Sequence, residues 1–431
     1  MKFIENNELL KSFIRKYINS TRDKSDIVIK TIMALMAGTI LLSQPSPNAI
    51  HHELVTGDGK ATFYRDIHDL ATDIPTLYND AFVAMQGDSK LAMRKDGVLV
   101  IDEHLIEHSS TDIEGVAYYY SPSEEKHIIA MSMITMHYYR GSVEYPVAFE
   151  LYRRLAELKK RGKEEDYEAK NEIVRALIRE FFTRKGAPSL ALFDSFFMTK
   201  ENVLLLKALH VNYISRPKRP WTCSYKHKKY SLEELFETIP VKEFKNVTVR
   251  NPKSGKEKEQ LTAVRDVYCP RIGTHRVVFV DCTKETVEKN DKEAAETKTT
   301  ASGRKFRLFV TNVLTWDAAT ILSKYSLRWT IETSYRDMNQ NLSLSGCKWQ
   351  ELSAQYLFIA LTFLCYLFLA WARVHGCLAG YNSELRTVGQ LKEAFSHYCQ
   401  HHYYNWWKVL EQQSKTSNVD KWIIERVYAS S

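Results

Sequence analysis

The first ninety residues show a spacing of apolar positions that is typical of helices. An apolar run at 26–42 predicts one helix, and shorter runs at 47–55 and 61–71 predict two more, joined by a TGDG turn. Two short helices across a glycine-containing turn are also the pattern of a helix-turn-helix, whose second helix enters a DNA groove. Lys60, Arg65 and His68 would then face DNA. Any small helical domain contains such turns, so a purely structural role stays open.

From residue 95 the pattern changes to β-strands. Apolar and β-branched runs at 98–101, 127–138, 143–152 and 190–193 predict four strands, of which the middle two form a hairpin. A charged helix at 163–184, closed by Gly186, follows the hairpin. The first and last of these strands each end on an aspartate, Asp102 and Asp194. A single aspartate at a strand end usually forms a turn, so the two aspartates indicate a catalytic site only together with a third acid.

Residues 201–305 predict a basic, mostly β module. Its strands and the one that follows it are expected at 213–215, 221–225, 247–250, 261–268, 276–281 and 306–311. Between residues 213 and 310 there are 22 Lys or Arg against 13 Asp or Glu, so this segment carries the whole positive excess of a chain with net charge +8. Such an excess favours a polyanionic partner.

The segment 315–340 predicts a helix, because no Pro or Gly interrupts it. At 100° per residue, one stripe of this helix carries an acid among basic and polar groups: Tyr325, Arg328, Glu332, Arg336 and Asn339. A solvated helix face with an Arg328–Glu332 pair is one interpretation. A face that handles phosphate is the other. The geometric argument covers the whole stripe only if the helix does not break near Trp329.

Composition narrows the class of protein. A chain of 431 residues predicts two or three domains, and 44% apolar with 26% charged residues is typical of a folded globular protein. Seven cysteines without a CxxC pair, and no signal peptide, predict reduced thiols in a cytosolic compartment. The uncharged run 354–372 is long enough to span a membrane. Gln355 and Thr362 within it favour a buried core helix, and a membrane span is the alternative.

The three acids fit one kind of chemistry. Phosphodiester cleavage by two divalent metals needs several converging carboxylates, and Mg²⁺ prefers such oxygen ligands. Asp102 and Asp194, at the ends of neighbouring strands, would form one side of the site. Glu332, from a helix laid across the sheet, would form the other. Arg328 and Arg336 would then grip the DNA backbone, since arginine binds phosphate through paired hydrogen bonds.

This order of elements resembles the DDE transposases of bacterial and archaeal insertion sequences. It is most similar to the branch with a β insertion domain and a Tyr-x2-Arg-x3-Glu-x6-Lys signature. The chain matches that signature at Tyr325, Arg328 and Glu332, and it has Asn339 in place of the Lys. The segments LVIDEH and LALFDSF match the two aspartate motifs. An amide at position 339 could still hydrogen-bond a phosphate, but without the charge.

The resemblance implies an α/β fold with an RNase H-like catalytic core, a mixed sheet with flanking helices, a helical N-terminal domain and a mostly β insertion domain. The expected boundaries are 1–90 for a helical DNA-binding domain, 91–200 and 306–380 for the core, 201–305 for the insertion, and 381–431 for a helical C-terminal region.

It also implies an activity. The expected function is Mg²⁺-dependent cleavage at the terminal inverted repeats of a mobile element, with Mn²⁺ able to substitute, and joining of the freed 3′-OH to target DNA by a homodimer. Asp102, Asp194 and Glu332 would be the catalytic and metal-binding residues, and Tyr325 would also contact DNA. Trp221, the one Trp of the insertion, would stack on a flipped base if a hairpin intermediate forms.

The expected location is the prokaryotic cytoplasm, with the protein on the nucleoid when bound to DNA and away from membranes. The alternative function is a catalytically silent, transposase-derived protein that binds specific DNA sequences. Asn339 favours this alternative faintly, while the intact acids oppose it.

Overall fold

The computed structural model describes residues 7–18, 26–54, 59–71, 74–121, 125–217, 221–270, 272–283, 297–300, 302–382 and 384–414. The chain forms two compact units. The helical unit consists of Met1–Leu91 with Asp337–Ser431, and the sheet unit consists of Ala92–Arg336. Each unit is described by itself below, and the four-part division expected from the sequence stays a prediction.

The sheet unit is built on one mixed sheet of 13 strands. The strands are β1 (Val98–Glu107), β2 (Val116–Ser121), β3 (Lys126–Arg140), β4 (Val143–Tyr152), β5 (Leu190–Phe193), β6 (Asn212–Ser215), β7 (Thr222–Tyr225), β8 (Lys228–Ser231), β9 (Lys245–Arg250), β10 (Glu257–Cys269), β11 (Gly273–Asp281), β12 (Lys298–Thr299) and β13 (Lys305–Thr311). Their main order is β2-β3-β1-β5-β6-β13-β11-β10-β7-β8.

The central strand is β1, which pairs antiparallel with β3 and parallel with β5. The long β3 also pairs with β2 along its first half and with β4 along its second half. Beyond β5 the parallel strand β6 follows, and β6 pairs with β13. Through β13 the strands of the predicted insertion continue the same sheet, so this β module shares a ladder with the core.

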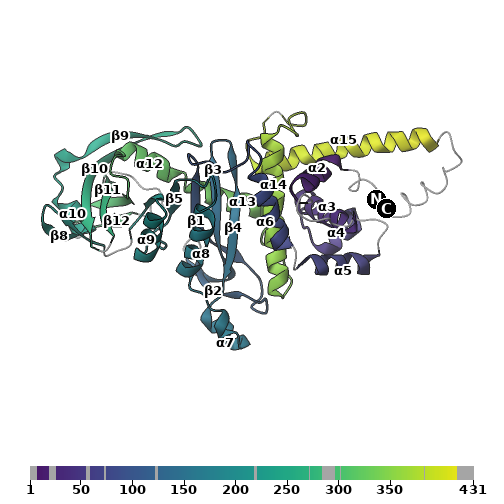
Figure 1. Cartoon of the computed structure of the whole chain (residues 1–431), viewed down its shortest axis with the longest axis horizontal. Helices are drawn as coiled ribbons and strands as arrows, with labels where there is room; N and C mark the ends of the chain where they lie inside the picture. The colour runs from purple at the N-terminus through teal and green to yellow at the C-terminus, as the bar shows by residue number, and fades with distance from the viewer. Residues whose placement is uncertain are drawn as a thin grey trace. The chain divides into compact units, whose positions relative to one another are not determined.

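Helices flank this sheet. They are α7 (Leu155–Arg161), α8 (Lys170–Phe182), α9 (Lys200–Ala208), α10 (Leu232–Thr238), α12 (Ala318–Ser326) and the start of α13 (Trp329–Leu342), with short 3₁₀ turns η1 (Glu164–Asp166) and η2 (Val241–Glu243). Helix α8 buries Ile173, Leu177 and Phe181 at helical spacing and contacts β3 and β4 (Figure 1). The mixed α/β fold with flanking helices and an RNase H-like core is thus confirmed.

The helical unit contains α2 (Glu8–Tyr17), α3 (Asp26–Leu41), α4 (Pro47–Leu54), α5 (Lys60–Ala71), α6 (Ile74–Met85), α14 (Leu352–Val374) and α15 (Val388–Ser414). The apolar helix α14 contacts α3, α5, α6 and α15. By length and composition it could cross a membrane, yet 83% of its most apolar stretch is buried inside the protein. A core helix has the same pattern, so this run is no evidence for a membrane protein.

Several predicted boundaries were wrong. Strand β1 does not end at Asp102 but continues to Glu107, because the polar residues after Ile101 pair with the long β3. The helix expected at 163–184 starts at Lys170 and ends at Phe182, while Gly186 lies in a later turn. Strand β2 and helices α6 and α7 were missed. The predicted turn at 56–59 lies, except for Gly59, outside the described residues.

The helix expected over 315–340 is two helices. Asp317 caps α12 by accepting a hydrogen bond from the Thr320 amide, and α12 ends at Ser326. Helix α13 then starts at Trp329. The single stripe from Tyr325 to Asn339 is therefore wrong as geometry, and helical spacing relates only the residues from Glu332 onward.

Candidate active site

Two aspartates lie next to each other at the centre of the sheet. The last pair in the parallel register of β1 and β5 is Ile101 with Phe193, so Asp102 is the next residue of β1 and Asp194 is the first residue after β5. Neighbouring strands are about 4.8 Å apart, and residues in register point to the same face. The local pattern of β1 and β5 thus brings together two carboxylates that are 92 positions apart in sequence.

Helix α13 lies across the same face of the sheet as Asp102. Thr135 pairs with Asp102 across the β1–β3 ladder, and His104 is two residues further along β1, so all three share what we call the acid face. The Tyr335 hydroxyl makes a short hydrogen bond with the Thr135 hydroxyl. The Tyr335 ring stacks on His104 with centroids 4.3 Å apart. These contacts fix the first turns of α13, which carry Glu332.

Arg328 joins the acid of the sheet to the acid of the helix. Its Nη1 donates to Oδ2 of Asp102 over 2.9 Å, and its Nη2 donates to Oε1 of Glu332 over 2.8 Å. The Arg328 side chain is only 6% exposed. One buried guanidinium therefore bridges two carboxylates from the break between α12 and α13, where the predicted single helix is interrupted.

The three acids converge closely enough to change the ionisation of one of them. Burial raises the pKa of Asp102 to about 7, Arg328 opposes this rise, and the negative charges of Asp194 and Glu332 add to it. The carboxylate of Asp194 accepts hydrogen bonds from the main-chain amides of Phe196 (2.9 Å) and Phe197 (3.3 Å). These amides hold Asp194 at the end of β5.

The carboxylates do not form a ready metal cage as the side chains lie. Within the ranges that the structure describes, no group of three or more His, Cys, Asp or Glu side chains is spaced to hold a metal ion. Asp102 and Glu332 both bind the Arg328 guanidinium instead. Hard oxygen donors crowded around a cation are nevertheless the chemistry that a divalent metal ion would fit.

Tyr325 lies beside the acids, while Arg336 faces solvent. The guanidinium carbon of Arg328 is 5.9 Å from the ring centre of Tyr325 and 5.7 Å from that of Trp329. Tyr325 itself is buried against Phe309, with ring centroids 5.0 Å apart. Arg336 is exposed on α13.

The other predicted site residues lie elsewhere. Asn339 belongs to the helical unit, where it lines a cavity of about 420 Å³. Lys60 and Arg65 are exposed on α5 of that unit. Trp221 precedes β7 and lies edge-on to His275, with ring centroids 6.5 Å apart. Within the sheet unit the structure therefore brings together the three acids and Arg328, with Tyr325 next to them, while Trp221 contacts His275.

Three residues of the site were not predicted from the sequence: His104, Thr135 and Tyr335. Period-two alternation along β1 could have identified His104, since it shares the face of Asp102. Tyr335 is three residues after Glu332 and so falls near it on the helix surface. Nothing in the sequence indicates the contact between Thr135 and Tyr335, which are 200 positions apart.

Comparison with known families gives an independent assignment. Residues 162–368 match the model of a family described as Transposase DDE domain. The matched segment contains Asp194 and Glu332 and begins after Asp102. No curated protein matches the chain. Proteins of the matched family act on DNA and generally use divalent metal ions. The resemblance to DDE transposases found in the acid motifs is thereby confirmed, and residues 162–368 form a transposase DDE domain.

Proposed function

We propose that this transposase cleaves DNA at the terminal inverted repeats of its own mobile element and joins the freed 3′-OH ends to target DNA. The observation that carries this proposal is the convergence of Asp102, Asp194 and Glu332 around one buried guanidinium. Three carboxylates from two strands and a helix are too costly to gather for packing alone, because like charges in a buried site destabilise the fold.

We further propose that these three carboxylates hold divalent ions, Mg²⁺ by preference with Mn²⁺ able to substitute. The donors are hard oxygens, and Arg328 already supplies a positive charge between two of them. Such ions would activate the attacking hydroxyl and stabilise the charge on the scissile phosphate. Asp194 is preset for this task by the two amides that orient its carboxylate.

Arg328 would have two roles in this scheme. Without DNA it bridges Asp102 and Glu332 and offsets part of their negative charge. Once another cation balances them, its guanidinium can turn to a phosphate of the DNA backbone, for which it has the geometry. Tyr325 and the exposed Arg336 would contact the same backbone, and the basic strands β7 to β10 would extend that contact.

The remaining assignments are also proposals. Lys60 and Arg65 on α5 would read or grip the element ends, Trp221 would stack on a flipped base, and Asn339 would hydrogen-bond a phosphate. We propose a homodimer in the DNA complex, a prokaryotic cytoplasmic location and no association with membranes. The domain boundaries expected from the sequence belong to this proposal as well.

The test is a cleavage assay on the element ends, identified as inverted repeats in the DNA that flanks the gene. Glu332→Gln and Asp102→Asn should each reduce Mg²⁺-dependent strand cleavage by at least roughly 10³-fold while DNA binding persists. Arg179→Gln, an exposed change on α8, serves as a control that keeps all three acids. Cleavage at the wild-type rate by either acid variant would refute the assignment.

The same assay separates the alternative function. A catalytically silent, transposase-derived DNA-binding protein would bind the end sequence but would not nick it with Mg²⁺ or Mn²⁺. Asn339, in place of the Lys of the signature, is the one feature that favours this alternative.

A further inference from the structure

A second cavity lies on the opposite face of the sheet from α13. Its volume is about 510 Å³, which is in the range of pockets that bind small molecules. Four aromatic and two cationic side chains line it: Tyr119, Tyr152, Tyr167, Phe196, Arg154 and Lys170. No role in the site described above accounts for this combination.

Strand alternation places this cavity relative to the acids. Glu103 follows Asp102 on β1 and therefore points to the other face, where its carboxylate accepts a hydrogen bond from the Ser132 hydroxyl (2.7 Å). Tyr152 pairs with Ser132 across the β3–β4 ladder and so shares that face. Lys170, at the start of α8, makes a short ion pair with Glu103.

The cations of the cavity lie over aromatic rings. The ammonium of Lys170 is 4.8 Å from the ring centre of Tyr152 and 5.5 Å from those of Tyr119 and Phe196. The guanidinium of Arg154 is 4.3 Å from the ring centre of Tyr119. Tyr167 is 40% exposed and offers an open ring at the cavity. Rings and fixed positive charge together are suited to a nucleobase and its phosphate.

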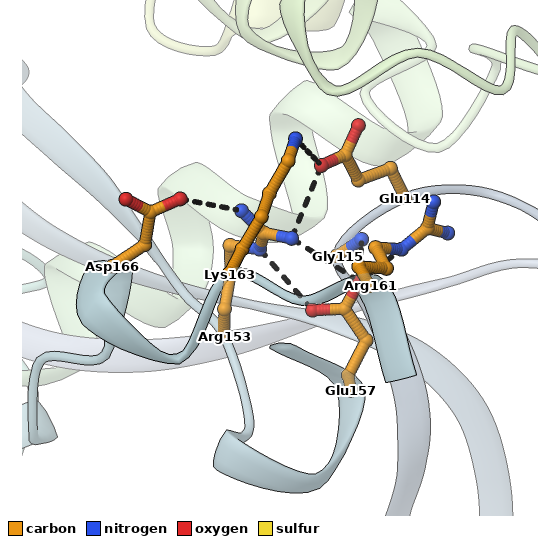
Figure 2. Close-up of polar contacts among 7 residues, drawn as sticks. All are labelled: Glu114, Gly115, Arg153, Glu157, Arg161, Lys163 and Asp166. Atoms are coloured by element: carbon orange, nitrogen blue, oxygen red, sulfur yellow. Dashed lines mark hydrogen bonds and ion pairs between the residues drawn. The ribbon is translucent and has the colours of Figure 1, made fainter. Parts of the chain in front are cut away.

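A partly buried ion network holds the wall of this cavity in place. Figure 2 shows Arg153 between Glu157 of α7, Glu114 of the β1–β2 connection and Asp166 of η1, at 3.2, 3.1 and 3.7 Å. The Arg153 side chain is 10% exposed, and Lys163 adds a contact to Glu114. Because these residues flank Arg154 and Tyr167 in the chain, the network fixes the segment that presents both. The cavity is therefore preformed.

One wall of the cavity lies close in sequence to Asp194, where β5 ends. Phe196 is two residues after Asp194, and Tyr152 is level with Leu105 through the β1–β3–β4 ladders. Leu105 is three residues past Asp102, which is about 10 Å along a strand. That distance equals roughly three steps of a DNA strand. This is the displacement along the sheet, and a strand bound at the acids would also have to pass around the carboxyl end of β5, next to Asp194 and Phe196, to enter the cavity on the other face.

We propose that this cavity is a subsite for one unpaired nucleotide of the DNA strand next to the cleavage site. The base stacks on Tyr167 and Tyr152, and the phosphate contacts Arg154 and Lys170. The location of this nucleotide next to a cleavage site rests on the proposed DNA cleavage, whereas binding of the nucleotide can be measured without any cleavage.

The probe is a short single-stranded oligonucleotide carrying one 2-aminopurine, whose fluorescence falls on stacking, with the matching duplex for comparison. The full-length protein should quench the single strand. Tyr167→Leu should weaken binding of the single strand roughly tenfold, since stacking on one aromatic ring contributes about 1–3 kcal/mol. Arg154→Gln, an exposed change, should weaken it several-fold, and duplex binding should change little in both variants.

Matched controls come from the same elements. Tyr118→Leu removes a tyrosine that is 57% exposed on β2, and Lys159→Gln removes an exposed cation of α7. Neither should alter quenching. Equal losses in control and cavity variants, or unchanged binding by Tyr167→Leu with an unaltered melting temperature, would overturn the subsite. Displacement of the probe by an unrelated aromatic peptide as effectively as by DNA would overturn it in favour of a peptide site. If the protein does not nick DNA but its quenching of the probe still depends on Tyr167, the proposed cleavage activity is refuted and the subsite is not.

Discussion

Arg328→Met tests whether one guanidinium is the cation that keeps the acids together. The substitution keeps most of the side-chain volume and leaves Asp102 and Glu332 without their shared positive partner, at 2.9 and 2.8 Å. Removing one partner of a buried pair costs about 3–5 kcal/mol. Asp102 and Glu332 keep 14% and 22% of their exposure, so water can relieve part of this cost, and we expect about 3 kcal/mol.

This loss can be measured as a change in melting temperature in EDTA. The sheet unit, Ala92–Arg336, falls in the size class in which 1 kcal/mol corresponds to about 2–4 °C. The expected decrease is therefore about 6–12 °C. Added Mg²⁺ or Mn²⁺ should restore more stability to the variant than to the wild type, because the metal replaces the missing cation. At 100 times its dissociation constant a metal ion contributes about 2.7 kcal/mol, nearly the whole loss.

Arg336→Met is the matched control. Arg336 is exposed on α13, the helix that begins directly after Arg328, and its substitution should change stability by less than about 0.5 kcal/mol. An unchanged melting temperature for Arg328→Met in EDTA would refute the idea that its charge holds the acids. Equal stabilisation of wild type and variant by metal would refute competition between guanidinium and metal.

Two further predictions concern other buried ion clusters. Burial alone would raise the pKa of Asp88, but hydrogen bonds from Tyr17, the Lys90 amide and Lys16, with the charge of His375, outweigh it and lower that pKa below 3.8. Asp88→Asn should therefore lower the free energy of unfolding by about 2 kcal/mol at pH 7. Only an ionised Asp88 stabilises the fold, so the difference between variant and wild type should shrink as the pH falls below about 4. Urea titrations from pH 7 to pH 3 measure this difference, and a difference that stays constant would contradict the prediction. Arg153→Gln should speed tryptic cleavage within α7 several-fold through loss of its three ion pairs, whereas the exposed Arg179→Gln on α8 should not.

The sequence predicts the acids better than it predicts their surroundings. Asp102 and Asp194 could be found because apolar runs precede both, and Glu332 because its motif matches a family. The break between α12 and α13 could not, since no Gly or Pro marks it. The break between the two helices occurs at Arg328, whose side chain contacts Asp102, 226 positions away in sequence. Local patterns contain no information about such a contact.

The predicted extents of the strands were wrong for a related reason. Strand β1 runs past Asp102 because β3 offers hydrogen-bonding partners as far as Ala130, although the residues 102–104 of β1 are polar. Strand β2 was missed because its three tyrosines form no clear alternation until β3 is known to pair with them. Tertiary pairing overrides local propensity in both cases.

The ladder that joins β6, β13 and β11 has a mechanical consequence. Because the insertion strands are hydrogen-bonded to the core through β13, they cannot swing away on a flexible linker without breaking that ladder. A pull on DNA held by the basic strands would load the backbone hydrogen bonds of β13 in shear. Six residues of β13 pair with β11 and share this load. DNA bound by the outer strands of the insertion would thereby be held at a fixed distance from the carboxylates.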